Sequence, residues 1–175
     1  MTNLRKAKPS EAEEILRFYH NIINSIKETD FKPKWNEHYP NLEYIKTSIE
    51  KKELYTCTMD NTIISCVIIN NQFSPEYENI KWAIDARTDE VAVIHTFAVN
   101  SNFSRKGIGK EIFEQIKINA LNSNQKTIRT DVIDGNIGAQ KFFKKIGFQY
   151  VDNIELFHEA VGLEKFHIYE YLLKK

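Results

Sequence analysis

The chain has 175 residues, enough for one domain with a full hydrophobic core and too few for two ordinary domains. Hydrophobic residues make up 42% and charged residues 27%, the balance of a soluble globular protein. Lysine plus arginine and aspartate plus glutamate number 24 each, so the formal net charge is zero and the chain lacks the basic surface of a nucleic-acid binder. We therefore expect a single domain over residues 1–175 and no nucleic-acid partner.

No long apolar run is present, so we expect no transmembrane helix and no membrane partner. The first residues, MTNLRKAKPSEAEE, lack the apolar segment of a signal peptide, which predicts a cytoplasmic protein. The two cysteines, Cys57 and Cys66, have no metal-ligand or redox spacing. We expect two free thiols and no metal site.

The chain opens with signals for one short strand and two helices. Residues 3–8 alternate like an edge strand, and Ser10 with Glu13 fits a capping box at the start of a helix. A second helix is expected over about 42–51, capped by Asn41 or a neighbour. The apolar stripe of the first helix consists of Ile15, Leu16, Tyr19, Ile22, Ile23 and Ile26.

A hairpin follows the two helices. Residues 54–59 and 62–70 predict its strands, because Asp60 and Asn61 between them tolerate the positive φ of a tight turn. The numbers of paired residues would then sum to 121. This register places the two cysteines diagonal to each other rather than opposite.

The middle of the chain predicts a loop, a buried strand and a helix. Residues 71–89 are polar and predict a loop. Residues 91–99, VAVIHTFAV, are nearly all apolar or β-branched, which suits a central strand buried on both faces. The glycine-containing stretch 103–113, FSRKGIGKEIF, leads into a helix expected over about 108–121.

The last third alternates between strands and a helix. Residues 127–133 predict a strand, Asn136 precedes a short helix, and Gly147 stands where a C′ glycine belongs. Residues 148–151 and 167–173 predict closing strands. The order predicts an α+β (α/β-like) domain around a mixed sheet. The apolar residues of the short helix are Ile137, Ala139, Phe142, Phe143 and Ile146.

The glycine pair in the stretch GIGK at 107–110 is compatible with no standard nucleotide motif. A P-loop would need glycine at Ser104 and a hydroxyl at Glu111. A dinucleotide fingerprint would need a third glycine at Ile112. Both motifs are therefore excluded.

The physics that these motifs share still applies to the loop. A buried strand ends, the chain turns through glycines that expose N–H groups, and a helix begins, which together favour a phosphate or pyrophosphate. Arg105, Lys106 and Lys110 add positive charge. A plain strand-to-helix turn with solvated basic residues fits the loop equally well.

The flanks of this loop resemble a known family. Residues 93–109, VIHTFAVNSNFSRKGIG, closely resemble the acyl-CoA signature of the GNAT superfamily of N-acetyltransferases, a buried strand ending in Ala-Val followed by Arg/Gln-x-x-Gly-x-Gly/Ala. Residues 136–148, NIGAQKFFKKIGF, resemble the second motif of that family, and residues 4–15 resemble its first strand and helix. The resemblance spans most of the chain.

The resemblance implies the GNAT fold, a mixed, mostly antiparallel sheet that is splayed between its fourth and fifth strands and flanked by about four helices. Acetyl-CoA would lie in the splay, with its pantetheine arm on the backbone of the fourth strand and on Asn136. Its pyrophosphate would lie on the amides of residues 105–110. The implied cofactor-binding residues are Phe97, Ala98, Val99, Arg105, Lys106, Gly107, Ile108, Gly109, Lys110, Asn136 and Phe143.

Two positions depart from the family pattern. The Arg/Gln position of the signature is Ser104, and the arginine comes one residue later, at Arg105. The tyrosine that relatives often use as a general acid toward the departing sulfur is Phe143, which cannot donate a proton. Another group or water would protonate the thiolate, or the thiolate would leave unaided.

The candidate general base is His95, which shares one face of the strand with Phe97 and resembles the histidine of some arylalkylamine-acetylating relatives. A hydrogen-bonded core histidine fits the same pattern. The candidate acceptor pocket, Trp35, His38 and Tyr39, lies in a proline-broken loop, although these side chains could also pack over the edge of the core.

The resemblance implies an acetyl-CoA-dependent N-acetyltransferase that moves an acetyl group to a primary amine of a small molecule or peptide, by direct attack in a ternary complex. The alternative is a non-catalytic acyl-CoA-binding sensor with the same fold. Because dimers are common among relatives, the resemblance is also compatible with a homodimer.

Overall fold

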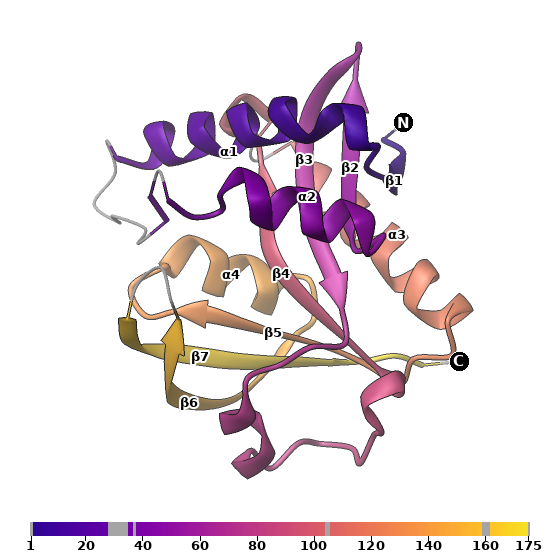
Figure 1. The fold of residues 1–175 in the computed structure, drawn as a ribbon. Coiled ribbons are helices and arrows are strands. Elements are labelled where there is room, and N and C mark those ends of the chain that lie inside the picture. Colours follow the sequence, from indigo (N-terminus) through magenta and orange to yellow (C-terminus); the bar gives the residue numbers. More distant parts are fainter. Residues whose placement is uncertain (1, 28–34, 37, 104–105, 159–161, 175) are drawn as a thin grey trace. The chain divides into compact units, whose positions relative to one another are not determined.

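The computed structural model describes residues 2–27, 35–36, 38–103, 106–158 and 162–174 (Figure 1). None of the helices in these ranges is long and apolar enough to span a membrane.

The chain divides into two compact units, each built from two stretches of sequence. The first comprises Met1–Ile69 and Thr96–Ile116, and the second comprises Asn70–His95 and Lys117–Lys175. Strand β4 and helix α3 each continue from one unit into the other. The single domain expected over residues 1–175 stays a prediction.

The first unit combines two helices with the strands that begin the sheet. Its elements are β1 (Leu4–Lys6), the 3-10 turn η1 (Pro9–Glu11), α1 (Ala12–Lys27), α2 (Leu42–Glu50), β2 (Leu54–Met59), most of β3 (Thr62–Asn70), the end of β4 (Val91–Val99), η4 (Ser101–Phe103) and the start of α3 (Ile108–Asn122).

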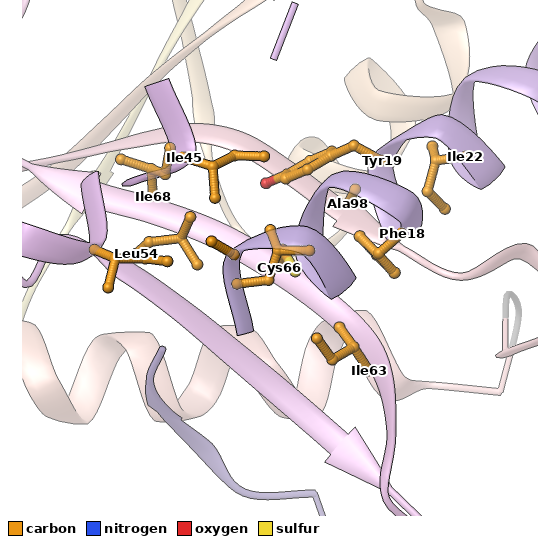
Figure 2. Packing of buried hydrophobic residues seen from close by; sticks show 12 residues of the cluster. Phe18, Tyr19, Ile22, Ile45, Leu54, Ile63, Cys66, Ile68 and Ala98 are labelled. Carbon is orange, nitrogen blue, oxygen red and sulfur yellow. The ribbon is translucent and has the colours of Figure 1, made fainter. Parts of the chain in front are cut away.

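The core of the first unit lies between the two helices and the hairpin strands. The apolar stripe of α1, with Phe18, Tyr19 and Ile22, packs with Ile45 of α2 against residues of the strands such as Ile68 (Figure 2). Full burial of a side chain of this size stabilises the fold by about 1.5–3 kcal/mol. This core therefore fixes α1 on the sheet, which matters for the site described below.

The capping prediction for α1 is wrong in detail. Ser10 lies inside the 3-10 turn η1, which has its N-cap at Lys8 and a proline in its first turn. The capping carboxylate is that of Glu11, which accepts the Lys8 amide at 2.7 Å and also binds the guanidinium of Arg5. The prediction for α2 is confirmed, because Asn41 accepts the Tyr44 amide at 2.8 Å.

The hairpin has the predicted strands but not the predicted register throughout. Asp60 and Asn61 have φ values of 49° and 61°, as the tight turn requires. Next to the turn the pairing sums to 121, but a bulge between Cys57 and Thr58 shifts it, and Cys57 lies opposite Ser65. A bulge adds one unpaired residue, and the apolar pattern gives no signal for it. Both cysteines are buried free thiols.

The second unit contains the rest of the sheet and the last helix. Its elements are the 3-10 turns η2 (Pro75–Asn79) and η3 (Thr88–Glu90), the start of β4, the end of α3, β5 (Thr127–Ile133), α4 (Ile137–Lys145), β6 (Gln149–His158) and β7 (Gly162–Leu172). The last two strands extend well beyond the predicted 148–151 and 167–173. Both strands were predicted, but their extensions were not, because one face of this hairpin is exposed and polar along much of its length.

One face of β5 and β7 is covered by the segment before β4. The Arg129 guanidinium lies over the Trp82 ring, 3.7 Å from its centroid, and pairs with the buried carboxylate of Glu170 at 3.1 Å. The Tyr77 hydroxyl donates to Asp131 at 2.7 Å. Charges this deeply buried need such partners, so the network ties residues 71–90 to one face of the sheet.

Among the residues that the structure describes, the sheet has seven strands in the order β1-β2-β3-β4-β5-β7-β6. The β4–β5 pair is parallel, whereas the β1–β2, β2–β3, β5–β7 and β6–β7 pairs are antiparallel. Together with the four α-helices of the described ranges, this confirms the mixed, mostly antiparallel α+β architecture that the resemblance implies. The β4–β5 ladder joins residues 91–93 to residues 127–129, and just beyond it the Thr130 hydroxyl donates to the Ile94 carbonyl at 3.1 Å.

Candidate functional site

Strand β4 bends at Thr96, three residues past Val93, its last residue in the ladder with β5. Thr96 has a φ of +48°, a left-handed backbone that β-branched residues rarely adopt. The buried phenol of Tyr19 on α1 holds this bend, because its hydroxyl donates to the Thr96 carbonyl at 3.0 Å. Burial raises the pKa of Tyr19 well above its ordinary value, so the donor proton is retained.

After the bend, β4 is anchored to β3. The Ser65 hydroxyl donates to the Ala98 carbonyl at 2.8 Å, and the Asn100 amide donates to the Ile64 carbonyl at 2.8 Å. Ala98 is buried in the core, whereas Phe97 and Val99 are half-buried. The strand that was expected to carry a ligand's backbone contacts is therefore held in place from its β3 side.

The glycine turn follows this anchored strand. Gly107 has a φ of +82°, is exposed, and would place an added Cβ in open space. Its carbonyl accepts the Glu111 amide at 3.0 Å and so starts α3. Lys106 and Lys110 are exposed on either side, whereas Ser104 and Arg105 lie outside the described residues. The predicted glycine turn at a helix N-terminus is present, with amides of the first turn of α3 that lack helical acceptors.

His95 is half-buried and lies in the second unit. Its Nε2 is 2.9 Å from Oδ1 of Asn70, and the same oxygen accepts the Gln72 amide at 3.0 Å. An amide oxygen can only accept, so Nε2 of His95 donates the proton and the lone pair of the neutral ring lies on Nδ1. The hydrogen bond to Asn70 fits a structural histidine of the core. The same bond also fixes the orientation of the ring, as a general base requires.

Asn136 and Phe143 have local structural roles on α4. Asn136 is the N-cap and accepts the Ala139 amide at 3.1 Å. Phe143 is buried and packs edge-on against Phe148 at a centroid distance of 5.1 Å, with Tyr169 stacked at 6.4 Å. These contacts account for the positions of both side chains without a ligand. Their predicted contacts with acetyl-CoA therefore stay predictions.

The three predicted acceptor residues lie in the first unit. Trp35 packs against the core, with its ring edge-on to Tyr19 at a centroid distance of 5.8 Å. The ring of Tyr39 contacts that of Tyr44 at 5.2 Å, and the amide of His38 donates to Asn36 at 2.8 Å. Trp35 therefore has the core-edge packing that was the alternative, and an acceptor role for all three residues stays a prediction.

Two features of the structure had no signal in the sequence analysis. The first is a cavity of about 380 Å³ within the first unit, between α1, the start of β3 and the residues that lead to the glycine turn. The second is a hydrogen bond between the side chains of His167 and Asp134 in the second unit, 33 positions apart in the sequence. The lining residues of the cavity are Glu14, Arg17, Phe18, Asn21, Ile22, Thr62, Ile63, Asn100, Ser101 and Asn102. Within the described ranges, no group of three or more metal-ligating side chains converges.

The model of the acetyltransferase (GNAT) family matches residues 20–148, which is most of the chain. The chain belongs to this family. The match confirms the resemblance in the sequence and identifies the protein as an N-acetyltransferase of the GNAT type. No curated protein matches the sequence.

Solved GNAT structures share the fold. The chain is similar to a GNAT-family acetyltransferase from Streptococcus agalactiae, with a TM-score of 0.76 and 17% identity over 99% of this chain and 96% of that one. An N-acetyltransferase from Staphylococcus aureus matches with a TM-score of 0.70 and 15% identity over 99% of each chain. The protein yncA from Salmonella typhimurium, solved with its cofactor acetyl-CoA, matches with a TM-score of 0.70 and 11% identity over 100% of this chain and 95% of that one.

The bend in β4 generates a first prediction. Replacing Tyr19 by Phe removes the donor to the Thr96 carbonyl and should lower the free energy of unfolding by about 1–2 kcal/mol. Tyr55→Phe, which removes one hydroxyl from β2 of the same unit, is the control. Urea denaturation measures both, and equal losses would mean that the hydrogen bond to Thr96 does not stabilise the bend.

The glycine turn generates a second prediction. Gly107→Ala places a side chain on a left-handed backbone and should lower the free energy of unfolding by about 1 kcal/mol, although the surrounding space is open. Gly138→Ala is the matched control, because this glycine is helical and alanine there should stabilise the fold by about 0.5–1 kcal/mol. Changes of the same sign in the two variants would contradict the assigned conformation.

Proposed function

We propose that the protein transfers an acetyl group from acetyl-CoA to a primary amine of a small molecule or peptide, by direct attack in a ternary complex. The observation that carries the proposal is the exposed glycine turn at the N-terminus of α3, which follows the bent strand β4 and the 3-10 turn η4 in a chain of the GNAT family. The solved structure of yncA with acetyl-CoA, which has the same fold, supports this choice of cofactor.

The residues of the glycine turn fit an anionic cofactor. The turn has no side chain at Gly107, open space around it, and exposed lysines at Lys106 and Lys110. A pyrophosphate would accept hydrogen bonds from the amides of residues 105–110. The backbone of Phe97 and Val99 would bind the pantetheine arm as an added strand does, with Asn136 at its end.

The amine must lose a proton before it reacts. When bound, acetyl-CoA supplies a thioester whose carbonyl carbon accepts the amine. A primary amine with a pKa near that of lysine, about 10.4, arrives as an ammonium ion. His95 is the proposed proton acceptor, and the proton goes to Nδ1 because Nε2 already donates to Asn70. The amide of Val99 would polarise the carbonyl.

The bonds and protons of the reaction then balance. The amine nitrogen forms a bond to the carbonyl carbon, the carbon–sulfur bond breaks, and the nitrogen gives up its second proton. That proton ends on the sulfur, so the products are an amide and free CoA thiol, with one proton released from His95 to solvent. Phe143 cannot deliver the proton to sulfur, so water or the His95 imidazolium does so.

Replacing His95 by Gln generates the test of this proposal. The variant keeps a hydrogen-bonding side chain but no base, so kcat should fall by about 10²–10³-fold while acetyl-CoA affinity stays within about twofold. His20→Gln, on α1, is the control and should keep its activity. The measurement is thiol release from acetyl-CoA together with the mass of the product, over a broad panel of amines.

Two outcomes would contradict the proposal at different levels. An unchanged kcat in the His95 variant would remove this residue from the mechanism and leave the transferase intact. An absence of acetylated product with every amine, in a protein that is folded and binds acetyl-CoA, would contradict acetyl transfer to amines itself and favour a non-catalytic acyl-CoA sensor.

A further inference from the structure

The cavity within the first unit, which we call the α1 cavity, has no role in the reaction described above. Its lining residues come from α1, from the start of β3 and from residues 100–102, and all of them belong to the same compact unit. Its volume of about 380 Å³ lies in the range of ligand pockets, about 300–1,000 Å³, and is far larger than the space of one water molecule. The cavity can therefore hold a small organic molecule.

The floor of the α1 cavity is apolar. Phe18 and Ile22 of α1 and Ile63 of β3 line it, and all three are buried members of the core cluster (Figure 2). Because the packing of the core holds these side chains, the shape of the floor is set before any ligand enters. An apolar group of a ligand would leave water on this floor, which favours binding.

The rim of the α1 cavity carries one anion and one cation. Glu14 is half-buried and Arg17 is exposed, and both line the cavity. They lie one turn apart on α1, so their side chains project from the same side of the helix. Among the residues that the structure describes, neither side chain has an ion-pair or hydrogen-bond partner, although the two could pair with each other. Both charges are therefore available to a ligand.

A third charge nearby, that of Arg5, does not neutralise Glu14. The hydrogen bond from Arg5 to Glu11 is the main cause that raises the pKa of Arg5, and the attraction of Glu14 is a smaller one. The two Nη atoms of Arg5 each donate to an oxygen of the Glu11 carboxylate. Because Glu11 occupies this guanidinium, the charge of Glu14 is left for the cavity.

The part of the cavity wall at residues 100–102 is a fixed 3-10 turn. The amide of Asn100 donates to the Ile64 carbonyl at 2.8 Å, which ties the turn to β3. Within the turn, Oδ1 of Asn100 accepts the Asn102 amide at 3.0 Å, and its carbonyl accepts the Phe103 amide at 2.9 Å. Ser101 and Asn102 are exposed, so their side chains offer hydrogen-bonding groups where a ligand would enter.

These features together select a zwitterion with an apolar group. A guanidinium binds a carboxylate through two parallel hydrogen bonds, and a carboxylate binds an ammonium ion. A free α-amino acid carries a carboxylate and an ammonium on one carbon atom, and its side chain can lie on the apolar floor. A peptide fits less well, because its interior has neither charge and each of its ends has only one.

We propose that the α1 cavity binds a free α-amino acid with an apolar side chain as an effector. Its carboxylate binds Arg17, its ammonium binds Glu14, and its side chain lies on the floor of the cavity. The ligand is not the acetyl acceptor, because none of the residues proposed to bind acetyl-CoA or to accept the proton of the amine lines the cavity. The pairing with Glu14 also keeps its amine protonated and unreactive.

The position of the cavity indicates what the effector controls. Ser101 and Asn102 line it and come directly before Phe103, from which the chain continues into the glycine turn. A ligand that binds these residues should stabilise the path into the turn and so strengthen the binding of acetyl-CoA. By linkage, acetyl-CoA should strengthen the binding of the amino acid by the same factor. This coupling rests on the proposed function, whereas the amino-acid site itself does not.

The first test is calorimetric titration of the full chain with leucine, with leucinamide, which lacks the carboxylate, and with 4-methylpentanoate, which lacks the ammonium. Leucine should bind with a Kd below about 1 mM, and each analogue should bind about tenfold more weakly. Equal binding of all three compounds would overturn the zwitterion site. So would the absence of binding by leucine, valine, methionine and phenylalanine at millimolar concentrations.

The second test removes the two charges one at a time. Arg17→Gln should raise the Kd for leucine about tenfold and leave that for leucinamide unchanged, because leucinamide has no carboxylate. Glu14→Gln should weaken leucine similarly and leave 4-methylpentanoate unchanged. Lys46→Gln and Glu43→Gln, exposed positions on α2 of the same unit, are the matched controls and should change no Kd. A variant that weakens all three compounds alike would contradict the assigned contacts.

The third test measures the coupling. Saturating leucine should lower the Kd for acetyl-CoA about fivefold in the wild-type protein and leave it unchanged in Arg17→Gln. An unchanged Kd in the wild-type protein would overturn the effector role, and so would acetylation of leucine itself. If the protein binds no acetyl-CoA, the proposed function fails, and the titrations with leucine and its analogues alone then support or overturn the amino-acid site.

Discussion

The left-handed backbone at Thr96 is the constraint on which the site depends. A β-branched residue in this conformation costs about 1–3 kcal/mol, so the surrounding structure has to enforce it. The enforcing contacts are the hydroxyl of Tyr19 and the anchoring of the strand end to β3 through Ser65. Tyr19 can hold the bend because the apolar stripe of α1 fixes the helix on the sheet (Figure 2). A core of ordinary hydrophobic contacts thereby sets the path of β4 into the glycine turn.

The two faces of the sheet in the second unit carry different kinds of side chains. One face carries the buried pair of Arg129 and Glu170 under Trp82, whose charges satisfy each other and hold residues 71–90. The other face carries α4, whose buried Phe143 packs on Tyr169, and the hydrogen bond between His167 and the exposed side chain of Asp134. The buried charges on the first face support the architecture, because each has its partner inside the protein.

Much of this could be predicted from the sequence where local signals are strong. The runs at 91–99 and 127–133 became strands with the predicted bounds, because β-branched residues fill them and turns flank them. The bulge at Cys57 and the bend at Thr96 could not be predicted. The pattern of apolar residues in a strand is the same whether or not the strand contains a bulged residue or a residue with positive φ. The pair of Asp134 and His167 depends on strand pairing across 33 positions, which no local pattern reports.

The measurement that tests the account most directly is calorimetric titration of the protein with acetyl-CoA, alongside free CoA. The account predicts binding of both in the micromolar range, on the order of −8 kcal/mol, because the glycine turn and the amides of α3 recognise the part that they share. The absence of binding at millimolar concentrations would mean that the turn holds no pyrophosphate. The fold would then stand, and the acetyl-CoA-dependent reaction would be contradicted.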